Sequence, residues 1–331
     1  MDKKRERQLL YEVSLAGWSF LFRPLKIAGY RDTIKAASPH AAAPRRRRQK
    51  EVPMLIHSDW HVHCDASYDA SLPLRQILKD AAALGIRQVG ITDHLNFNDP
   101  SFLGDIHRSA AQVHALQAQF PQLVLGVELT PIEKPLFDHI ARTGTREGFV
   151  PPAAPTPYPI ELALTREELM ALGVRYAVGG SHWRVDVPYA RQLPADRDAC
   201  IREWFRQQLW LACDDRVTVL AHPWYIGSGL WYDDFDVIPR SMNDELAAAV
   251  KQHGKYVECC EGMLCDPLAS ERFRRQYAEF LRGLFELGIP LTYGSDSHDV
   301  YAPDVGKAEE YLLAAGFRDG DIGPVAEKDF W

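Results

Sequence analysis

Six of the twelve histidines in this chain of 331 residues follow short apolar segments, at the point where each segment gives way to polar residues. Those six are His61, His63, His94, His182, His222 and His298. Carboxylates stand in the same position, since Asp93 precedes His94, Glu128 ends another apolar segment, and Asp296 lies two residues before His298. Imidazole nitrogens and carboxylate oxygens are common ligands of divalent metal ions. The pattern therefore indicates a shared metal site.

The sequence His61-Val62-His63 is a specific local signal. In an extended chain, side chains at positions i and i+2 point to the same face, so these two imidazoles can bind one metal ion. One histidine at the end of a strand is more often a structural residue than a ligand. Here the same placement recurs six times, and a metal also relieves the mutual repulsion of so many buried polar groups. We therefore predict that the six histidines line one metal-binding rim.

The elements that must position these residues begin near Met54, where short apolar runs start to alternate with helical segments. This alternation predicts parallel strands joined by helices. Seven strands in series favour a barrel over an open sheet, and a barrel of about 250 residues fits the segment 51–331 as one domain. The predicted strands are Met54–Ser58, Gln88–Thr92, Leu123–Val127, Tyr176–Gly180, Val217–Ala221, Tyr256–Cys259 and Pro290–Gly294.

Two connections between the predicted strands are long. Thr130–Thr165 holds too many prolines for a continuous helix, and Trp224–Pro239 is rich in aromatic residues and aspartate. Loops that follow barrel strands line the mouth of the active site. We therefore expect both connections to border the metal-binding rim.

The first 50 residues form a separate basic extension. They hold 13 Lys and Arg against 4 Asp and Glu, whereas the rest holds 25 against 41, within a total net charge of −7. A possible helix over Arg5–Phe22 precedes a linker with four consecutive arginines at 45–48, and we favour a solvated tail over a nucleic-acid-binding or membrane-binding arm. The acidic body makes nucleic acid an unlikely partner. Oligomeric state is left open.

Cysteine usage and hydropathy indicate the compartment. Six cysteines without C-x-x-C pairs do not form a disulfide framework, so we expect reduced, mostly buried thiols. The apolar stretch at Leu15–Leu21 is short and has no cleavage site close behind it, so we predict no signal peptide and no membrane span. These features favour a cytoplasmic protein.

Six ordered motifs resemble those of the PHP (polymerase and histidinol phosphatase) superfamily, and the resemblance covers roughly residues 54–305. It implies an α/β fold, a distorted seven-stranded (β/α)7 TIM-like barrel of PHP type. The motifs are Asp59-Trp60-His61-Val62-His63, Thr92-Asp93-His94, Gly126-Val127-Glu128, Gly180-Ser181-His182, Ala221-His222-Pro223 and Gly294-Ser295-Asp296-Ser297-His298.

The resemblance also implies a trinuclear site of zinc, manganese or iron. Its first metal position would be held by His61, His63, Glu128 and Asp296. Glu128 would bridge to a second position, held by His182 and His222. The third would be held by Asp69, His94 and His298. Residue 69 is a carboxylate where some relatives have histidine, and an oxygen ligand favours a harder metal, so metal identity stays open.

Three divalent ions against three carboxylates leave surplus positive charge, which suits a phosphate dianion. A water shared by two ions would be acidified and attack phosphorus in line. We therefore predict a metal-dependent phosphoesterase that hydrolyses a small-molecule phosphate monoester by a metal-activated hydroxide, with a histidinol-phosphatase-like enzyme as the nearest family example. The catalytic residues would be His61, Glu128 and Asp296, with Arg184 either clamping the phosphate or lying in solvent.

Other residues near the motifs have less specific roles. Asp93 is expected to orient a histidine rather than to bind metal. Glu258, at the end of the sixth strand, is either a general acid, a group that binds substrate, or a salt-bridged rim residue. Arg240 is expected at the surface or in a structural role. Three tryptophans either line a substrate pocket or pack within loops: Trp183, Trp224 and Trp231.

Two other functions compete with phosphate-ester hydrolysis. Metal barrels of the amidohydrolase type also begin with His-x-His, but no lysine stands at the end of the fourth strand to bridge metals, and the Asp296-x-His298 ending fits the PHP pattern better. A non-catalytic PHP module with structural metals would use the basic extension to bind a partner. The complete set of ligand positions argues against such a loss of catalysis.

Overall fold

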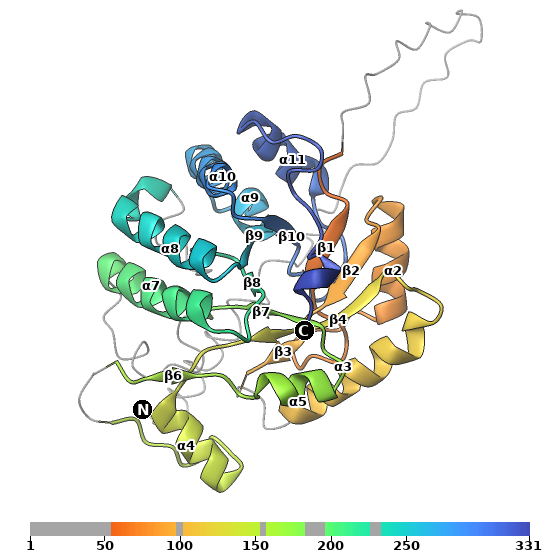
Figure 1. Ribbon diagram of the computed structural model, residues 1–331, viewed down its shortest axis with the longest axis vertical. Coiled ribbons are helices and arrows are strands. Elements are labelled where there is room, and N and C mark those ends of the chain that lie inside the picture. The colour runs from red at the N-terminus through yellow and green to blue at the C-terminus, as the bar shows by residue number, and fades with distance from the viewer. Residues whose placement is uncertain (1–53, 97–101, 153–156, 183–195, 226–232) are drawn as a thin grey trace, which may run out of the picture. The chain divides into compact units, whose positions relative to one another are not determined.

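The computed structural model describes residues 54–96, 102–152, 157–182, 196–225 and 233–331. The predicted basic extension, residues 1–50, lies outside this part of the chain, so its role stays a prediction. Within residues 54–331, helices surround a central ring of strands (Figure 1). No helix in the described ranges is both long and apolar enough to span a membrane.

Seven parallel strands form the ring in chain order, as predicted. They are β1 (Ser58–Val62), β2 (Gln88–Ile91), β4 (Leu123–Leu129), β7 (Tyr176–Gly179), β8 (Val219–Leu220), β9 (Tyr256–Cys260) and β10 (Leu291–Gly294). A short strand, β3 (His94–Leu95), also pairs with β4. The remaining two, β5 (Ile132–Glu133) and β6 (Ile160–Glu161), form an antiparallel pair in the long connection after β4.

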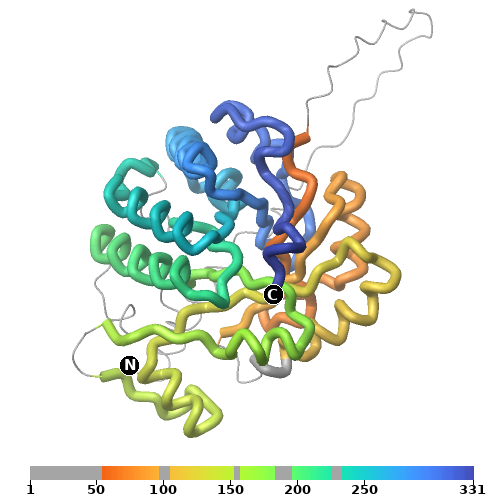
Figure 2. Tube along the Cα trace, viewed as in Figure 1, coloured from red at the N-terminus to blue at the C-terminus, as the bar shows by residue number. Residues whose placement is uncertain are grey.

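Helices connect the strands and pack outside them. The α-helices are α2 (Leu74–Ala83), α3 (Phe102–Gln117), α4 (Lys134–Thr143), α5 (Arg166–Ala171), α7 (Arg197–Cys213), α8 (Arg240–Gln252), α9 (Glu261–Cys265), α10 (Glu271–Glu286) and α11 (Val305–Ala314). Two 3₁₀ turns accompany them, η1 (Phe235–Val237) and η2 (Glu327–Asp329). The tube in Figure 2 follows the chain around the ring of strands, and the orange first part and the blue last part of the described chain lie side by side.

The boundaries of α10 show why this sequence forms helices at these places. Ser270 caps the first turn by accepting a hydrogen bond from the N–H of Phe273. Buried side chains recur at helical spacing along the face that packs on the barrel, including Tyr277 and Leu281. Gly288 follows the helix with a φ of 81°, a left-handed conformation that favours glycine. The Ser270 cap therefore sets where α10 begins, and the left-handed Gly288 sets where it ends.

The barrel closes where β1 meets the segment after β10. The N–H of Asp296 donates to the carbonyl of His61 over 2.8 Å, and the N–H of His63 donates to that of Ser297 over 3.0 Å. Val62 and Ser297 form a parallel bridge between the same segments. These contacts are made at the metal-ligand motifs themselves, so closing the barrel brings the first and last motifs together.

The first strand lies later in the chain than predicted. We predicted Met54–Ser58, but β1 begins at Ser58 and contains His61. Leu55 and Ile56 are fully buried, so the apolar run at Met54–Ser58 belongs to the core, but the prediction that it forms a strand is wrong. The start of β1 is set by its pairing with β2, in which Ser58 lies opposite Gln88.

Aromatic side chains fill the end of the barrel opposite the ligand motifs. The Tyr176 hydroxyl donates to the carbonyl of Trp60 over 2.8 Å, and a Cβ atom at Gly90 or Gly126 would collide with the Tyr176 ring. Phe330 packs against the same cluster. Because side chains fill the barrel at this end, a site can form only at the other end, where the strands have their carboxyl ends.

Candidate metal centre

Glu128 lies in β4 at the centre of the predicted ligands and is fully buried. Its Oε1 atom lies 3.0 Å from Nε2 of His222 and 3.2 Å from Nε2 of His182. Its Oε2 atom faces a second set of ring nitrogens, His94 Nδ1 at 2.7 Å, His61 Nε2 at 3.4 Å and His63 Nε2 at 3.5 Å. A carboxylate whose oxygens face two separate histidine sets has the geometry of a bridging ligand.

The histidine pair of β1 converges with Asp296, as the first predicted metal position requires. Oδ1 of Asp296 lies 3.1 Å from Nε2 of His63 and 3.5 Å from Nε2 of His61. The possible ligand atoms of these three residues all lie within 4.8 Å of one another. The same limit holds for the set of His61, Glu128 and His222 and for the set of His94, Glu128 and His182.

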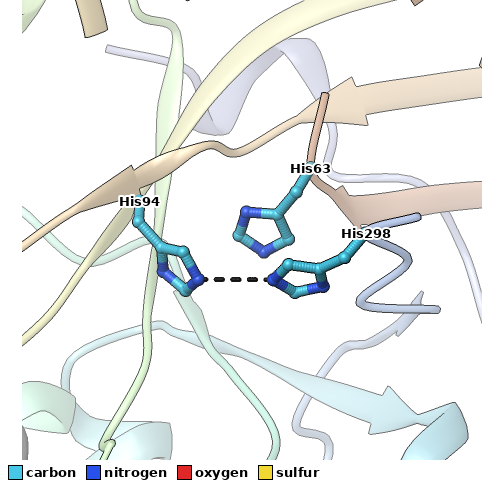
Figure 3. A group of neighbouring side chains, drawn as sticks. All are labelled: His63, His94 and His298. Carbon is cyan, nitrogen blue, oxygen red and sulfur yellow. Dashed lines mark hydrogen bonds between the residues drawn. The ribbon is translucent and has the colours of Figure 1, made fainter. Parts of the chain in front are cut away.

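Asp69, His94 and His298, predicted for the third metal position, also meet. Oδ2 of Asp69 lies 3.2 Å from Nε2 of His94 and 3.9 Å from Nε2 of His298. Figure 3 shows the rings of His94 and His298 converging with that of His63, and their Nε2 atoms lie 3.4 Å apart. His63 therefore stands between the first and third positions. All nine predicted ligands occupy one continuous cluster.

Several inward-facing atoms of this cluster lie close to one another and are buried, yet make no well-aligned hydrogen bond in the described part of the chain. They are Nε2 of His61, Nε2 of His63, Oε2 of Glu128 and Oδ1 of Asp296. Leaving a polar atom buried and unsatisfied costs about 1–3 kcal/mol, so four such atoms at one point need a common explanation. Divalent cations fit, because each atom is a donor type that zinc, manganese and iron accept.

The electrostatics of the cluster differ among its members: Glu128 and His63 are held in the forms that bind cations, whereas nearby carboxylates raise the pKa of His61 and His94 despite their burial. Burial alone would raise the pKa of Glu128, yet the charges of His182, His61 and His94 lower it well below its usual range. Burial and the charges of the nearby His298 and His94 together lower the pKa of His63 to about 3, although Asp296 opposes them. Glu128 is thus ionised and His63 neutral, which are the forms that coordinate a metal.

Partners on the outer ring nitrogens orient several of the histidines. Nδ1 of His182 lies 2.9 Å from the hydroxyl of Thr130, and Nδ1 of His298 lies 2.8 Å from the carbonyl of Asp296. Each contact occupies Nδ1 and directs Nε2 into the cluster. Metal-bound histidines are typically held in this way by a group behind the ring.

Backbone strain marks two of the ligands. Among the described residues, non-glycine positions with positive φ are His222 at 28°, Trp224 at 66° and Asp296 at 54°. Such conformations cost about 1–3 kcal/mol each and persist where the surrounding structure imposes them, often at functional sites. One residue separates each of the two ligands from the end of a barrel strand, so the strained turns direct their side chains into the cluster.

The structure corrects the role of Asp93. We predicted that it orients a histidine, but its Oδ1 accepts from the N–H of Cys64 over 2.7 Å and its Oδ2 from the Cys64 thiol over 3.0 Å. Cys64 follows His63, so Asp93 fixes the backbone behind a ligand and not an imidazole ring. The direction of the Asp93 side chain depends on the conformation of the turn after β2.

Other predicted residues have mixed outcomes. Trp224 is fully buried and stacks on Phe205 of α7 with ring centroids 6.2 Å apart, so it packs in the interior against that helix. Arg240 is a surface residue, 93% exposed, as expected. All six cysteines are free, and four of them are buried. Arg184, Trp183 and Trp231 lie outside the described residues.

Sequence reasoning missed the groups that hold the ligand strands in place. Asp59 is buried in β1, where its Oδ1 accepts from the N–H groups of His61 at 3.2 Å and Ser295 at 3.0 Å. Its Oδ2 accepts from the hydroxyl of Tyr301 at 2.9 Å. Asp59 therefore ties β1 to the turn that carries Asp296. An acidic residue two positions before His61, and so on the same face of the strand, is the signal that could have identified it.

Comparison with known proteins identifies the family. A family model described as PHP domain matches residues 59–261. A solved structure of histidinol phosphate phosphatase from Lactococcus lactis subsp. lactis, complexed with zinc, L-histidinol and phosphate, is similar at 18% identity and a TM-score of 0.58, over 83% of this chain and 99% of that chain.

A structure described for the metal-dependent tyrosine phosphatases YwqE of Bacillus subtilis and CpsB of Streptococcus pneumoniae has 14% identity and a TM-score of 0.39, over 81% of this chain and 89% of that chain. No curated protein sequence matches the chain. The family model covers more than half of the chain and includes motifs that supply the cluster's ligands. The chain therefore belongs to the PHP domain family of metal-dependent phosphoesterases.

Proposed function

We propose that this protein hydrolyses a small-molecule phosphate monoester at a centre of three divalent metals. The observation that carries the proposal is the position of Glu128, whose two oxygens face separate histidine sets at 2.7–3.5 Å inside a fully buried cluster. Each of the nine predicted ligands contributes to this cluster. A structural metal site is typically closed around a single ion, whereas this arrangement extends over several positions.

The charge of the centre favours a phosphate dianion. Its ligand carboxylates are Asp69, Glu128 and Asp296, and the pKa of Asp296 is lowered far below its usual range by His61, His298 and His63, although burial raises it. Three divalent ions exceed the charge of these three carboxylates. Divalent ions, when bound, supply Lewis acidity to phosphoryl oxygens and lower the pKa of water.

The side chains of the chain hold and orient this chemistry. His61, His63 and His94 face Oε2 of Glu128, and His182 and His222 face Oε1, so Glu128 would bridge two metal positions. Thr130 keeps the ring of His182 turned inward. Arg184 follows His182 by two residues and is the candidate for phosphate contact, with a solvated position as the alternative.

A histidinol-phosphate-like monoester is the first substrate class to test. The similar structure from Lactococcus lactis is complexed with L-histidinol and phosphate, and that likeness extends over 99% of its length. The identity of 18% leaves the substrate of the present chain to be determined by assay.

The test combines metal analysis with turnover. The purified chain is loaded with zinc, manganese or iron(II) and assayed on phosphate monoesters, phosphate diesters and amides. We expect close to three metals per chain and turnover of a monoester. His61→Ala should lose metal and lower kcat/KM by at least about 100-fold, because it removes a ligand and not only its support.

The matched control is His57→Ala, at a partly exposed histidine that precedes β1 and pairs with Asp319 on the surface. It should keep both metal and turnover. Amide hydrolysis without ester hydrolysis would contradict the proposal in favour of an amidohydrolase, and full metal loading without turnover of any substrate would favour a non-catalytic module.

A further inference from the structure

Glu258 contacts the ring of His61 from behind. It lies in β9, is 1% exposed, and its Oε2 atom is 2.7 Å from Nδ1 of His61. The other ring nitrogen, Nε2, faces Oε2 of Glu128 and Oδ1 of Asp296 at 3.4 and 3.5 Å. The imidazole therefore stands between a carboxylate outside the ligand set and carboxylates within it.

This contact fixes the tautomer of His61. A carboxylate oxygen accepts hydrogen bonds, so in the contact between Glu258 and a neutral His61 the ring donates from Nδ1. Nε2 then carries the lone pair, and it points into the ligand cluster. A neutral histidine with a free Nε2 lone pair is the form that binds a metal.

The barrel makes room for this pair at one position. A Cβ atom at Gly294 would lie 2.6 Å from Cδ of Glu258 and 2.7 Å from Cβ of His61. Gly294 ends β10, which pairs with β9 so that Thr292 lies beside Glu258. Only a glycine at position 294 lets the Glu258 side chain cross to His61, so the contact is built into the fold.

We propose that Glu258 is a positioning residue that holds His61 as a metal ligand and makes no contact with substrate. The inference rests on the proposed function, in which His61 binds metal. Burial behind the imidazole excludes two roles considered from the sequence, a general acid and a substrate-binding group, because both need access to the bound ester. It favours the carboxylate–histidine–metal arrangement, in which the carboxylate raises the basicity of the ligand.

The experiment compares Glu258→Leu, which removes the acceptor, with Glu258→Gln, which keeps one oxygen but loses the charge. The control is Thr292→Val on the adjacent strand, since the Thr292 hydroxyl has no hydrogen-bond partner among the described residues. Metal affinity is measured on the full chain by competition of cobalt(II) with a chromophoric chelator. Long-range ¹⁵N–¹H spectra of the zinc-loaded chain, assigned with His61→Gln, report whether Nδ1 of His61 carries the proton.

We expect Glu258→Leu to weaken cobalt binding by about 10- to 100-fold and to lose the Nδ1–H tautomer of His61. Glu258→Gln should keep that tautomer and lie between the wild type and Glu258→Leu in affinity, and Thr292→Val should match the wild type. If Glu258→Leu does not fold, Glu258→Gln decides, and wild-type affinity in that variant overturns the inference.

Wild-type cobalt affinity and an unchanged tautomer in a folded Glu258→Leu protein would also overturn it. Both readouts are made without substrate, so they do not depend on which ester the enzyme cleaves. Loss of the proposed function would instead appear as an absence of turnover in the metal-loaded wild type, whatever the behaviour of the Glu258 variants.

Discussion

Gly180 leaves the space that the Glu128 carboxylate occupies. A Cβ atom at position 180 would overlap Oε1 of Glu128 and would lie 3.0 Å from Nε2 of His222. Gly180 follows β7 directly, and its N–H donates to the carbonyl of Leu129 over 3.0 Å, so its backbone cannot easily withdraw. The absence of a side chain at position 180 thus makes room for the Glu128 carboxylate from the neighbouring strand.

Gly180→Ala is therefore expected to displace Glu128 and reduce metal binding. Because the added methyl group meets the bridging oxygen, metal content should fall below that of the wild type and kcat/KM should fall by at least about tenfold. Metal analysis of the purified variant and steady-state kinetics check this.

Gly179→Ala is the matched control, because its Cβ would meet side-chain atoms of Val217 and Leu211 in the core, at 2.9 and 3.2 Å. It should lower the melting temperature and keep full metal content. Equal metal content in both variants would show that the space at position 180 has no role in the centre.

Asp59→Ala is expected to destabilise the barrel seam. It leaves the N–H groups of His61 and Ser295 buried without an acceptor, at about 1–3 kcal/mol each. The free energy of unfolding from urea denaturation should fall by at least about 2 kcal/mol. Tyr301→Phe, which loses one hydrogen bond to Asp59, should lower the free energy of unfolding by about 1 kcal/mol. An equal loss in the two variants would contradict the role of Asp59 in joining β1 to the turn that carries Asp296.

The stability of the metal-free chain should depend on pH through Glu261. Burial raises the pKa of its carboxyl from 4.5 to about 7, although the N–H of Asp304 lowers it. The fold thus favours the protonated form, so its stabilising effect is complete below about pH 4.5 and is lost as pH rises through about pH 7. Relative to Glu261→Gln, the wild type should lose stability across this window.

Urea denaturation after chelation, at pH values across this window, gives that comparison. Glu310→Gln, at an exposed position in α11, is the control and should follow the wild type. A constant difference between wild type and Glu261→Gln at all pH values would show that Glu261 does not titrate in the fold.

Cysteine reactivity should follow burial. Cys213 is exposed at the end of α7, whereas burial and the charge of Glu258 raise the pKa of the Cys259 and Cys260 thiols. Since the thiolate is the reactive form, iodoacetamide should modify Cys213 first and the buried pair only after unfolding. Peptide mass spectrometry of timed reactions checks the order, and rapid labelling of Cys259 in the folded chain would contradict it.

The convergence of the ligands was predictable because parallel strands of a barrel deliver their carboxyl ends to one rim. His182, His222 and Asp296 follow three different strands, and knowledge of strand order alone places them together. Their strained backbone was not predictable, since the left-handed φ values of His222 and Asp296 arise from tertiary contacts and not from local preference.

The groups behind the ligands depend on side-chain direction, which the sequence does not determine. Glu258 lies in the middle of β9 and Asp93 lies just beyond β2, and Glu258 contacts an imidazole whereas Asp93 contacts Cys64. Strand alternation and the register between strands decide between these outcomes. The displacement of β1 from its predicted bounds has the same cause, because pairing with β2 and not the apolar run sets its start.

The most direct test of the metal centre is anomalous diffraction from crystals grown with manganese or zinc and inorganic phosphate. The predicted result is metal peaks on both sides of the Glu128 carboxylate and a third between Asp69, His94 and His298, with phosphate oxygens bound to them. The proposal of a metal centre would be contradicted if crystals grown with saturating metal showed the cluster residues in order but no anomalous peak among them.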